Sequence, residues 1–281
     1  MPGTILLGID VETASEHAEG YVRYGRKLYH ELNIPVTWYV TGATLQKYPQ
    51  QFSEIEDDPL VELQSHTFGH TLLKTVFMDL PAGISAHGKS DWYLKAGGSL
   101  DQIEEDLKQC ERVFLQVLGR KPIGLTGPWG YYRGLQDRPD ILEVIHTHGY
   151  RYLRTFARDA RDCQPVPLDW QPFWYEAQGF ADILELCVHD YQDDFYWKAF
   201  ARPRPNQTYA EHLKQVADRV AKEDLIWSAA SHDHGCATQE GFWQKGAWIE
   251  DFVRYAKGLG IRFLSGSMVY EEQLRQLAAN T

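Results

Sequence analysis

The chain has 281 residues, 43% of them apolar and 24% charged, which is the composition of an ordinary globular protein with a sizeable core. Lys and Arg number 28 against 39 Asp and Glu, and the resulting net charge of −11 repels a polyphosphate and excludes nucleic acid as the expected partner. The longest apolar runs are far shorter than the roughly 20 residues of a membrane-spanning helix.

Short apolar segments rich in β-branched residues alternate with helical stretches along the chain. Alternation of this kind predicts βα units and a mostly parallel sheet, and seven or eight such units indicate a barrel. The predicted strands are 5–9, 36–40, 60–63, 123–125, 151–153, 183–186, 225–230 and 261–264.

Capping residues mark several of the predicted helices. A Ser or Thr followed three residues later by Gln or Glu forms a capping box at the start of a helix, and Gly commonly follows its last turn. The boxes are Ser99 with Gln102, ahead of a helix that ends before Gly119, and Thr208 with Glu211; a further helix lies between Pro139 and Gly149.

No linker or internal repeat divides the chain, so we expect one catalytic domain over residues 1–281. Two stretches, 71–98 and 157–181, are too long for simple connections, and loops of that length are commonly functional. We expect them to enclose the site. The 9 Trp and 16 Tyr suit either sugar stacking or generous core packing.

The N-terminal segment and the cysteines predict a cellular location. Residues 1–10 have no basic region, and Asp10 interrupts the apolar run, so they do not resemble a secretory signal. Four widely spaced cysteines without a CxxC pattern form neither a disulfide scaffold nor a zinc ribbon; they are Cys110, Cys163, Cys187 and Cys236. These features predict a reduced, cytoplasmic protein.

Two predicted strands are followed directly by residues with metal-binding chemistry. The first strand leads into Asp10-Val11-Glu12, and the third into Ser65 to His70, where His66 and His70 are four residues apart. Either pattern alone is more often ordinary surface. If a helical turn carries the two histidines, both imidazoles face one way and are spaced to hold one divalent cation.

A third strand, 225–230, ends in Ser231-His232-Asp233-His234. An imidazole titrates near neutral pH, so either His232 or His234 is a candidate proton donor, although an exposed loop histidine is the simpler interpretation of each. In a parallel barrel the carboxyl ends of the strands meet at one mouth. Three such strand ends together predict a catalytic site there.

These motifs resemble those of the polysaccharide deacetylases with a NodB homology domain (carbohydrate esterase family 4), which are metal-dependent enzymes on an α/β fold, a distorted, incomplete (β/α)7-type barrel. Asp10-Val11-Glu12 is similar to their first motif, and His66-Thr67-Phe68-Gly69-His70 to their H-[ST]-x-x-H metal motif. Residues 34–42 and 260–264 resemble their second and closing strands, so the resemblance runs nearly end to end.

The resemblance implies roles for particular residues. Asp10 is then the catalytic base and His232, in a segment similar to the family's final motif, the general acid. Glu12, His66 and His70 are the metal ligands, for zinc or alternatively cobalt, manganese or iron.

Three departures from the family pattern bear on the site. Val11 separates the two acids that are adjacent in the family. The family's Arg-Pro-Pro-Tyr-Gly motif, whose Arg steadies the catalytic Asp, corresponds here to 126–130, which has Thr126 in place of the Arg; that contact is absent or supplied by another residue, for which Arg133 is the candidate. Asp169-Trp170 is the candidate fourth motif, with Asp169 as partner of the catalytic His.

The function that this resemblance implies is hydrolysis of an N-acetyl or N-formyl amide on an amino sugar. Backbone N–H groups near Trp129 to Tyr131 are the expected second donor to the oxyanion. We expect a small or lipid-linked amino-sugar substrate rather than a polymer. The sequence leaves the acyl group, the metal and the oligomeric state, a homo-oligomer included, open.

Two other functions fit the same predicted barrel. A cyclic-amide or ureide hydrolase would use the same mouth without a sugar platform. A non-catalytic carbohydrate-binding barrel would agree with the many Trp residues and the missing Arg. A dinucleotide enzyme or a serine hydrolase is disfavoured, because the sequence contains neither a GxGxxG, nor a P-loop, nor a GxSxG motif.

Overall fold

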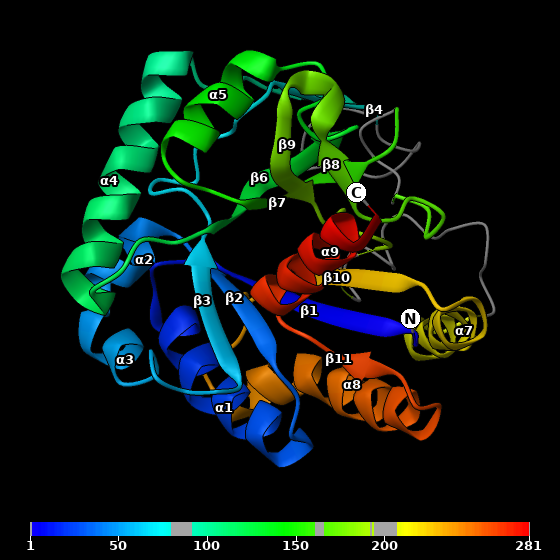
Figure 1. Cartoon of the computed structure of the whole chain (residues 1–281). Helices are drawn as coiled ribbons and strands as arrows, with labels where there is room; N and C mark the ends of the chain where they lie inside the picture. The colour runs from blue at the N-terminus through cyan, green and yellow to red at the C-terminus, as the bar shows by residue number, and fades with distance from the viewer. Residues whose placement is uncertain (1, 80–91, 161–165, 192, 194–206, 281) are drawn as a thin grey trace.

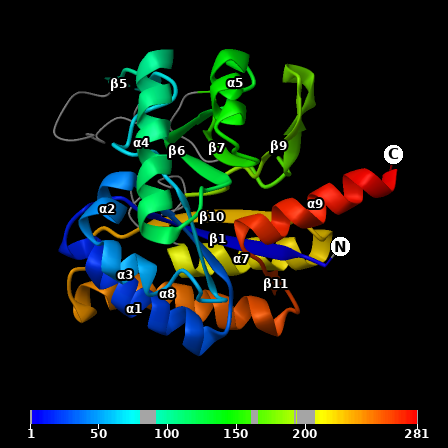
Figure 2. The same cartoon turned by 60° about the vertical axis from the view of Figure 1, so that its left-hand side comes forward.

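The computed structural model describes residues 2–79, 92–160, 166–191, 193 and 207–280 (Figure 1). Parallel strands lie at the centre and helices cover the outside, with α4 and α5 on one side and α1, α3 and α8 on another (Figures 1 and 2). None of the helices in these ranges is long and apolar enough to cross a bilayer.

The main sheet has the strand order β10-β1-β2-β3-β6-β7-β9-β8, and β11 pairs with the other edge of β1 near its start. All of its pairings are parallel except that of β8 with β9. The strands are β1 (Thr4–Val11), β2 (Val36–Val40), β3 (Val61–Ser65), β6 (Gly124–Tyr132), β7 (Tyr152–Arg158), β8 (Phe173–Tyr175), β9 (Phe180–Glu185), β10 (Ile226–His232) and β11 (Arg262–Phe263). Each predicted strand overlaps one of these.

The sheet formed by the described residues does not close into a complete barrel. Neither β8 nor β9 pairs with β10, so a gap remains between the two ends of the strand order. His189 bridges this gap, because its N–H donates to the carbonyl of Ser228 at 2.8 Å and its Nδ1 accepts the Ser228 N–H at 3.0 Å. The predicted distorted, incomplete barrel is confirmed.

The helices begin and end close to the residues that the sequence indicated. Both capping boxes are present, Gly119 is left-handed after α4, and α5 starts at Pro139. The helices are α1 (Glu16–Leu32), α2 (Gly42–Lys47), α3 (Pro49–Ser53), α4 (Leu100–Leu118), α5 (Pro139–Thr147), α7 (Tyr209–Glu223), α8 (Gln239–Gly258) and α9 (Gly266–Asn280), with a 3-10 turn η2 (Glu176–Gln178).

One end of the strands is closed by α9. The N–H of Gly266 donates to Thr37 Oγ1 at 2.8 Å, and the N–H of Ser267 donates to Glu62, near the amino ends of β2 and β3. The carboxyl ends of the strands therefore form the accessible mouth. The central strands are buried on both faces, as parallel strands under helices are, and Trp38 and Trp227 are fully buried. Many of the aromatic residues thus serve core packing.

The two long stretches contain some regular structure. Residues 71–98 hold an antiparallel hairpin of β4 (Val76–Asp79) and β5 (Trp92–Lys95), and 157–181 hold β8 and η2. Their parts 80–91 and 161–165 lie outside the described residues, as does Cys163.

Candidate metal centre

Three strand ends meet at the mouth as the sequence predicted. In the parallel pairing of β1 with β10, Asp10 lies beside His232, and β3 leads directly into His66. The three strand ends converge because neighbouring parallel strands end at the same edge of the sheet.

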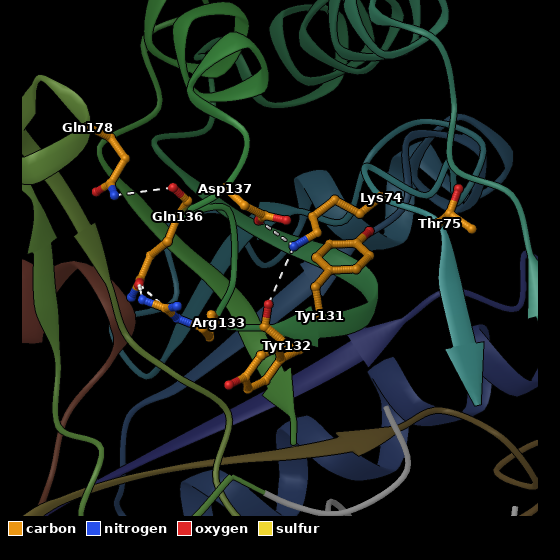
Figure 3. Close-up of a pocket in the computed structure, with 8 residues that line it drawn as sticks. All are labelled: Lys74, Thr75, Tyr131, Tyr132, Arg133, Gln136, Asp137 and Gln178. Carbon is orange, nitrogen blue, oxygen red and sulfur yellow. Dashed lines mark hydrogen bonds and ion pairs between the residues drawn. The ribbon is translucent and has the colours of Figure 1, made fainter. Parts of the chain in front are cut away.

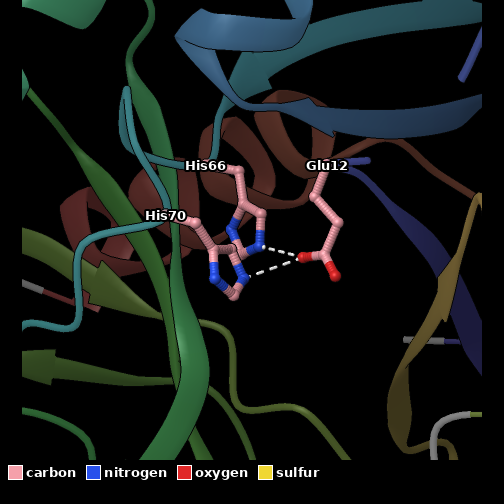
Figure 4. A group of neighbouring side chains, drawn as sticks. All are labelled: Glu12, His66 and His70. Carbon is pink, nitrogen blue, oxygen red and sulfur yellow. Dashed lines mark hydrogen bonds and ion pairs between the residues drawn. The ribbon is translucent and has the colours of Figure 1, made fainter. Parts of the chain in front are cut away.

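Glu12, His66 and His70 point at one another (Figure 4). The Nε2 atoms of both histidines lie 2.9 Å from the same carboxylate oxygen, Glu12 Oε2. Their ligand atoms all lie within 4.8 Å of one another, which fits two imidazoles and a carboxylate around one ion.

The surroundings of His66 support its assignment as a metal ligand. Its Nδ1 lies 2.9 Å from the carbonyl oxygen of Thr126, so Nδ1 carries a proton and donates it to that oxygen. In the neutral ring Nε2 then holds a lone pair facing Glu12. Two acceptors at 2.9 Å require a cation between them, which is a proton or a metal ion.

A third histidine contacts the other oxygen of the same carboxylate. His234 Nε2 lies 2.9 Å from Glu12 Oε1, so imidazoles face both oxygens of Glu12. Burial favours the protonated form of Glu12, but hydrogen bonds from His234, His66 and His70 overcome it and hold the pKa of Glu12 well below its usual range. Glu12 is therefore a carboxylate, as a metal ligand must be.

The loop that carries the two histidines is irregular, so it is not a helical turn that brings the two imidazoles together. Thr67 and His70 both have positive φ values, 61° and 59°, which non-glycine residues seldom adopt. Asp106 of α4 holds the loop in this shape: its carboxylate accepts the N–H groups of Phe68 and Gly69 at 2.6 and 2.9 Å. The conformation of this loop, rather than a helix, therefore brings two histidines four residues apart to the same carboxylate.

Asp10 is buried beside the metal cluster and faces a buried arginine. One of its oxygens, Oδ1, has no hydrogen bond to any described residue and lies 3.6 Å from Nη1 of Arg154. Arg154 is fully buried in the middle of β7. The same Nη1 donates to Thr126 Oγ1 at 2.9 Å, and Nη2 donates to the carbonyl of Ala229 at 2.8 Å.

Arg154, not Arg133, supplies the arginine contact to Asp10, so the expectation for Arg133 is wrong. Arg133 is exposed and donates to Gln136 instead. Arg154 stands directly across the β6–β7 ladder from Thr126, where the family has its Arg. The available signal in the sequence was a charged residue inside an apolar core strand.

His232 is oriented by an acid that the sequence analysis missed. Its Nδ1 lies 3.0 Å from Asp193 Oδ2, and its Nε2 lies 4.0 Å from Asp10 Oδ2. Burial lowers the pKa of His232, but the hydrogen bond and charge of Asp193, with Glu12 and Asp10, outweigh burial and raise it to about 9.

The expectation that Asp169 is the partner of the catalytic histidine is wrong. The Asp169 side chain is 72% exposed and pairs with Arg219 on α7 at 2.5 Å. Asp193 was hard to recognise because it stands in an acidic segment with three aspartates close together, Asp190, Asp193 and Asp194. Nothing in their order distinguishes the one that reaches His232.

The segment from Trp129 to Tyr131 leaves the regular ladder. The register of β6 with β7 shifts between Thr126 and Tyr131, and Trp129 and Gly130 are both left-handed, with φ of 69° and 62°. The side chain of Tyr131 is buried, and its hydroxyl accepts the N–H of Leu73 at 2.7 Å. The Tyr131 hydroxyl is therefore already engaged by the backbone.

A separate pocket of about 390 Å³ lies between Lys74 and Thr75, which follow the loop that carries His66 and His70, and the end of β6 (Figure 3). Lys74 crosses it to Asp137 at 2.6 Å, and Arg133 lies on its wall. None of the three candidate metal ligands lines it, so Arg133 belongs to this pocket. Its lining residues are Lys74, Thr75, Tyr131, Tyr132, Arg133, Gln136, Asp137 and Gln178.

Comparison with known proteins identifies the class to which this fold and site belong. The family model described as polysaccharide deacetylase matches residues 12–153, about half of the chain, and the chain belongs to that family. The description of this family names deacetylation of polysaccharides.

Individual relatives are distant. A peptidoglycan deacetylase of Helicobacter pylori is 22% identical over 195 residues, which cover 64% of this chain and 56% of that protein. The chain thus spans little more than half the length of this curated relative.

Two solved structures have the same fold. One, from Mycobacterium smegmatis and named as a polysaccharide deacetylase, has a TM-score of 0.65 at 17% identity and covers 97% of this chain and 90% of its own. The other, the PuuE allantoinase, has a TM-score of 0.65 at 15% identity, with 95% and 89% covered.

Proposed function

We propose that this chain is a metal-dependent hydrolase that removes an acetyl or formyl group from the nitrogen of an amino sugar, with residues 1–281 acting as one catalytic domain. The observation that carries the proposal is the convergence of His66 and His70 on one oxygen of Glu12, beside the buried carboxylate of Asp10. Zinc, cobalt, manganese and iron all suit two imidazoles and a carboxylate.

Glu12, His66 and His70 would hold the ion. When bound, an ion of this kind supplies Lewis-acid polarisation of an acyl oxygen and a lower pKa for a nearby water. The loop clamped by Asp106 keeps both imidazoles on Glu12 without rearrangement.

Asp10 is the proposed base. Its Oδ1 makes no hydrogen bond to the described residues, so this oxygen is available to accept a proton from water. The guanidinium of Arg154 lies 3.6 Å from the same oxygen and places an opposite charge beside the buried carboxylate.

His232 is the proposed acid. Its pKa of about 9 keeps the ring protonated at neutral pH, and Nδ1 donates to Asp193, so Nε2 holds the proton for the leaving amine. An amide nitrogen departs badly as an anion, so this proton must arrive as the carbon–nitrogen bond breaks. Backbone N–H groups of 129–131, outside the ladder, are the proposed donors to the oxyanion.

We propose a small or lipid-linked amino sugar in the cytoplasm as substrate. Cys110 and Cys187 are free and buried, which agrees with a reducing compartment.

The test is metal analysis combined with amine-release assays on N-acetyl amino sugars, N-formyl amino sugars and cyclic ureides. The expected result is about one ion per chain and release of amine from one of the two sugar classes. Turnover of cyclic ureides alone would contradict the proposal in favour of the cyclic-amide alternative. Binding of sugar without release of acetate or formate by the metal-loaded chain would favour the non-catalytic barrel.

A further inference from the structure

The hairpin of β4 and β5, which follows the loop carrying His66 and His70, has a lysine on its inward face and apolar residues on its outward face. In the register of β4 with β5, Val76 lies opposite Lys95 and Phe77 opposite Leu94. Directly opposed residues of an antiparallel pair share a face. Val76 is fully buried, whereas Phe77 and Leu94 are 49% and 56% exposed. Lys95 therefore lies on the inward face with Val76, the reverse of the usual pattern.

The base of the hairpin, at Gly97 and Gly98, is fixed to the segment 72–75 that follows His70. The N–H of Gly98 donates to the carbonyl of Leu72 at 2.8 Å, and the N–H of Gly97 donates to Thr75 Oγ1 at 3.1 Å. A Cβ at Gly97 would lie 2.5 Å from the carbonyl carbon of Lys74, so the two backbones are in close contact. Lys95 thus has a defined place relative to His70.

Lys95 reaches the mouth of the metal site. Its Nζ lies 4.9 Å from the centre of the ring of Trp129, in the segment that leaves the β6–β7 ladder after Thr126. The carbonyl of Thr126 in turn accepts from Nδ1 of His66. Arg158 approaches the same ring at 5.7 Å, and its Nε donates to the carbonyl of Trp129 at 2.6 Å. Two cations therefore flank Trp129.

The Lys95 ammonium forms no ion pair with any carboxylate in the described ranges. A ring face attracts the charge but leaves the three N–H donors of the ammonium without acceptors. Lysines turned toward protein are normally paired, and this one is partly buried in a chain whose net charge is −11, where acids are abundant. The described residues therefore supply no acceptor for the Lys95 ammonium.

We propose that Lys95, next to Trp129, binds an anionic substituent of the substrate, a carboxylate or a phosphate carried by the same sugar as the acyl amide. The proposal rests on the proposed function, because the metal cluster marks where the amide lies. It narrows the substrate class from N-acyl amino sugars in general to those that carry an anionic group.

Equilibrium binding tests this inference apart from turnover. The metal-loaded Asp10→Asn chain is titrated calorimetrically with neutral N-acetylglucosamine, with N-acetylmuramic acid, which adds a carboxylate, and with N-acetylglucosamine 1-phosphate. We expect at least one anionic sugar to bind about tenfold more tightly than the neutral sugar, and the two anionic ligands distinguish carboxylate from phosphate. Added salt should reduce this preference.

Lys95→Gln should abolish the preference while leaving the affinity for the neutral sugar unchanged, and Lys95→Arg should retain most of it. Lys74→Gln is the matched control, since Lys74 lies in the neighbouring pocket and already pairs with Asp137. Equal affinities for the three sugars, or no binding of any at millimolar concentration, would overturn the inference. Equal weakening of all three by Lys95→Gln would leave Lys95 only a structural contact to Trp129. Failure of the proposed function would appear separately, as no amine release by the metal-loaded wild type.

Discussion

The guanidinium of Arg154 lies 3.6 Å from the carboxylate of Asp10, although β7 and β1 are not neighbours in the sheet. The contact therefore crosses the interior of the barrel. Gly8 makes it feasible, because a Cβ there would lie 2.4 Å from the guanidinium carbon of Arg154. Thr126 accepts a hydrogen bond where the family has its own Arg. The arginine that the family carries on β6 is thus replaced here by Arg154, at the paired position of the neighbouring strand β7.

Arg154→Met should lower kcat about 10- to 100-fold with the metal retained, because Asp10 loses the positive charge 3.6 Å from its carboxylate. Thermal unfolding checks that the variant folds, since Arg154 also bonds Ala229. The double variant Thr126→Arg with Arg154→Thr returns the charge from the opposing strand and should recover part of kcat. Unchanged kcat in a folded Arg154→Met would remove Arg154 from the mechanism.

Local patterns in the sequence predicted the strands, the capped helices and the three strand ends, because each depends on residues close together in the chain. The partners of Asp10 and His232 depend on distant contacts. Arg154 reaches Asp10 across the barrel, and Asp193 is 39 residues from His232. Neither contact is encoded in a local pattern. Because β9 and β10 do not pair, no strand register fixes the position of the segment between them, which carries Asp193.

Asp10 and Glu12 can be separated by isosteric amides. Glu12→Gln removes the negative charge that three imidazoles contact, so metal content and turnover should fall together. Asp10→Asn should keep the metal and lower the rate about 10²- to 10⁴-fold, because the amide is no base. Metal analysis and turnover on both variants check this. Metal lost from Asp10→Asn but kept in Glu12→Gln would reverse the two roles.

His66→Ala and His70→Ala should each reduce bound metal to well below one ion per chain while the fold survives. One of three ligands is lost in each case, and the strands that form the core are untouched. His146→Ala is a suitable control, because His146 pairs with Asp182 away from the metal cluster. Full occupancy in both ligand variants, measured by elemental analysis, would end the assignment of the metal site.

The pH profile should reveal the link between Asp193 and His232. Asp193 helps raise the pKa of His232, and the acid acts only when protonated, so kcat/KM falls as pH rises through that pKa. Asp193→Asn removes the raising charge and should move the alkaline limb down by about 1 to 3 pH units. Asp169→Asn is the control and should leave the limb in place, because Asp169 pairs with Arg219. The same limb in wild type and Asp193→Asn would contradict His232 as the acid.

Asp106 should govern metal affinity without touching the metal. Its carboxylate holds Phe68, Gly69 and the Thr71 hydroxyl, and so maintains the left-handed residues of the loop. Asp106→Asn keeps the shape but replaces one acceptor oxygen by a donor, which opposes N–H groups of the loop. We expect about 10- to 100-fold weaker metal binding in a competition with a chelator, the range typical of residues that support a ligand. Asp101→Asn, an exposed acid on the same helix, should bind metal like the wild type. If Asp106→Asn binds as tightly as Asp101→Asn, the loop holds its shape without the clamp, and α4 has no part in forming the metal site.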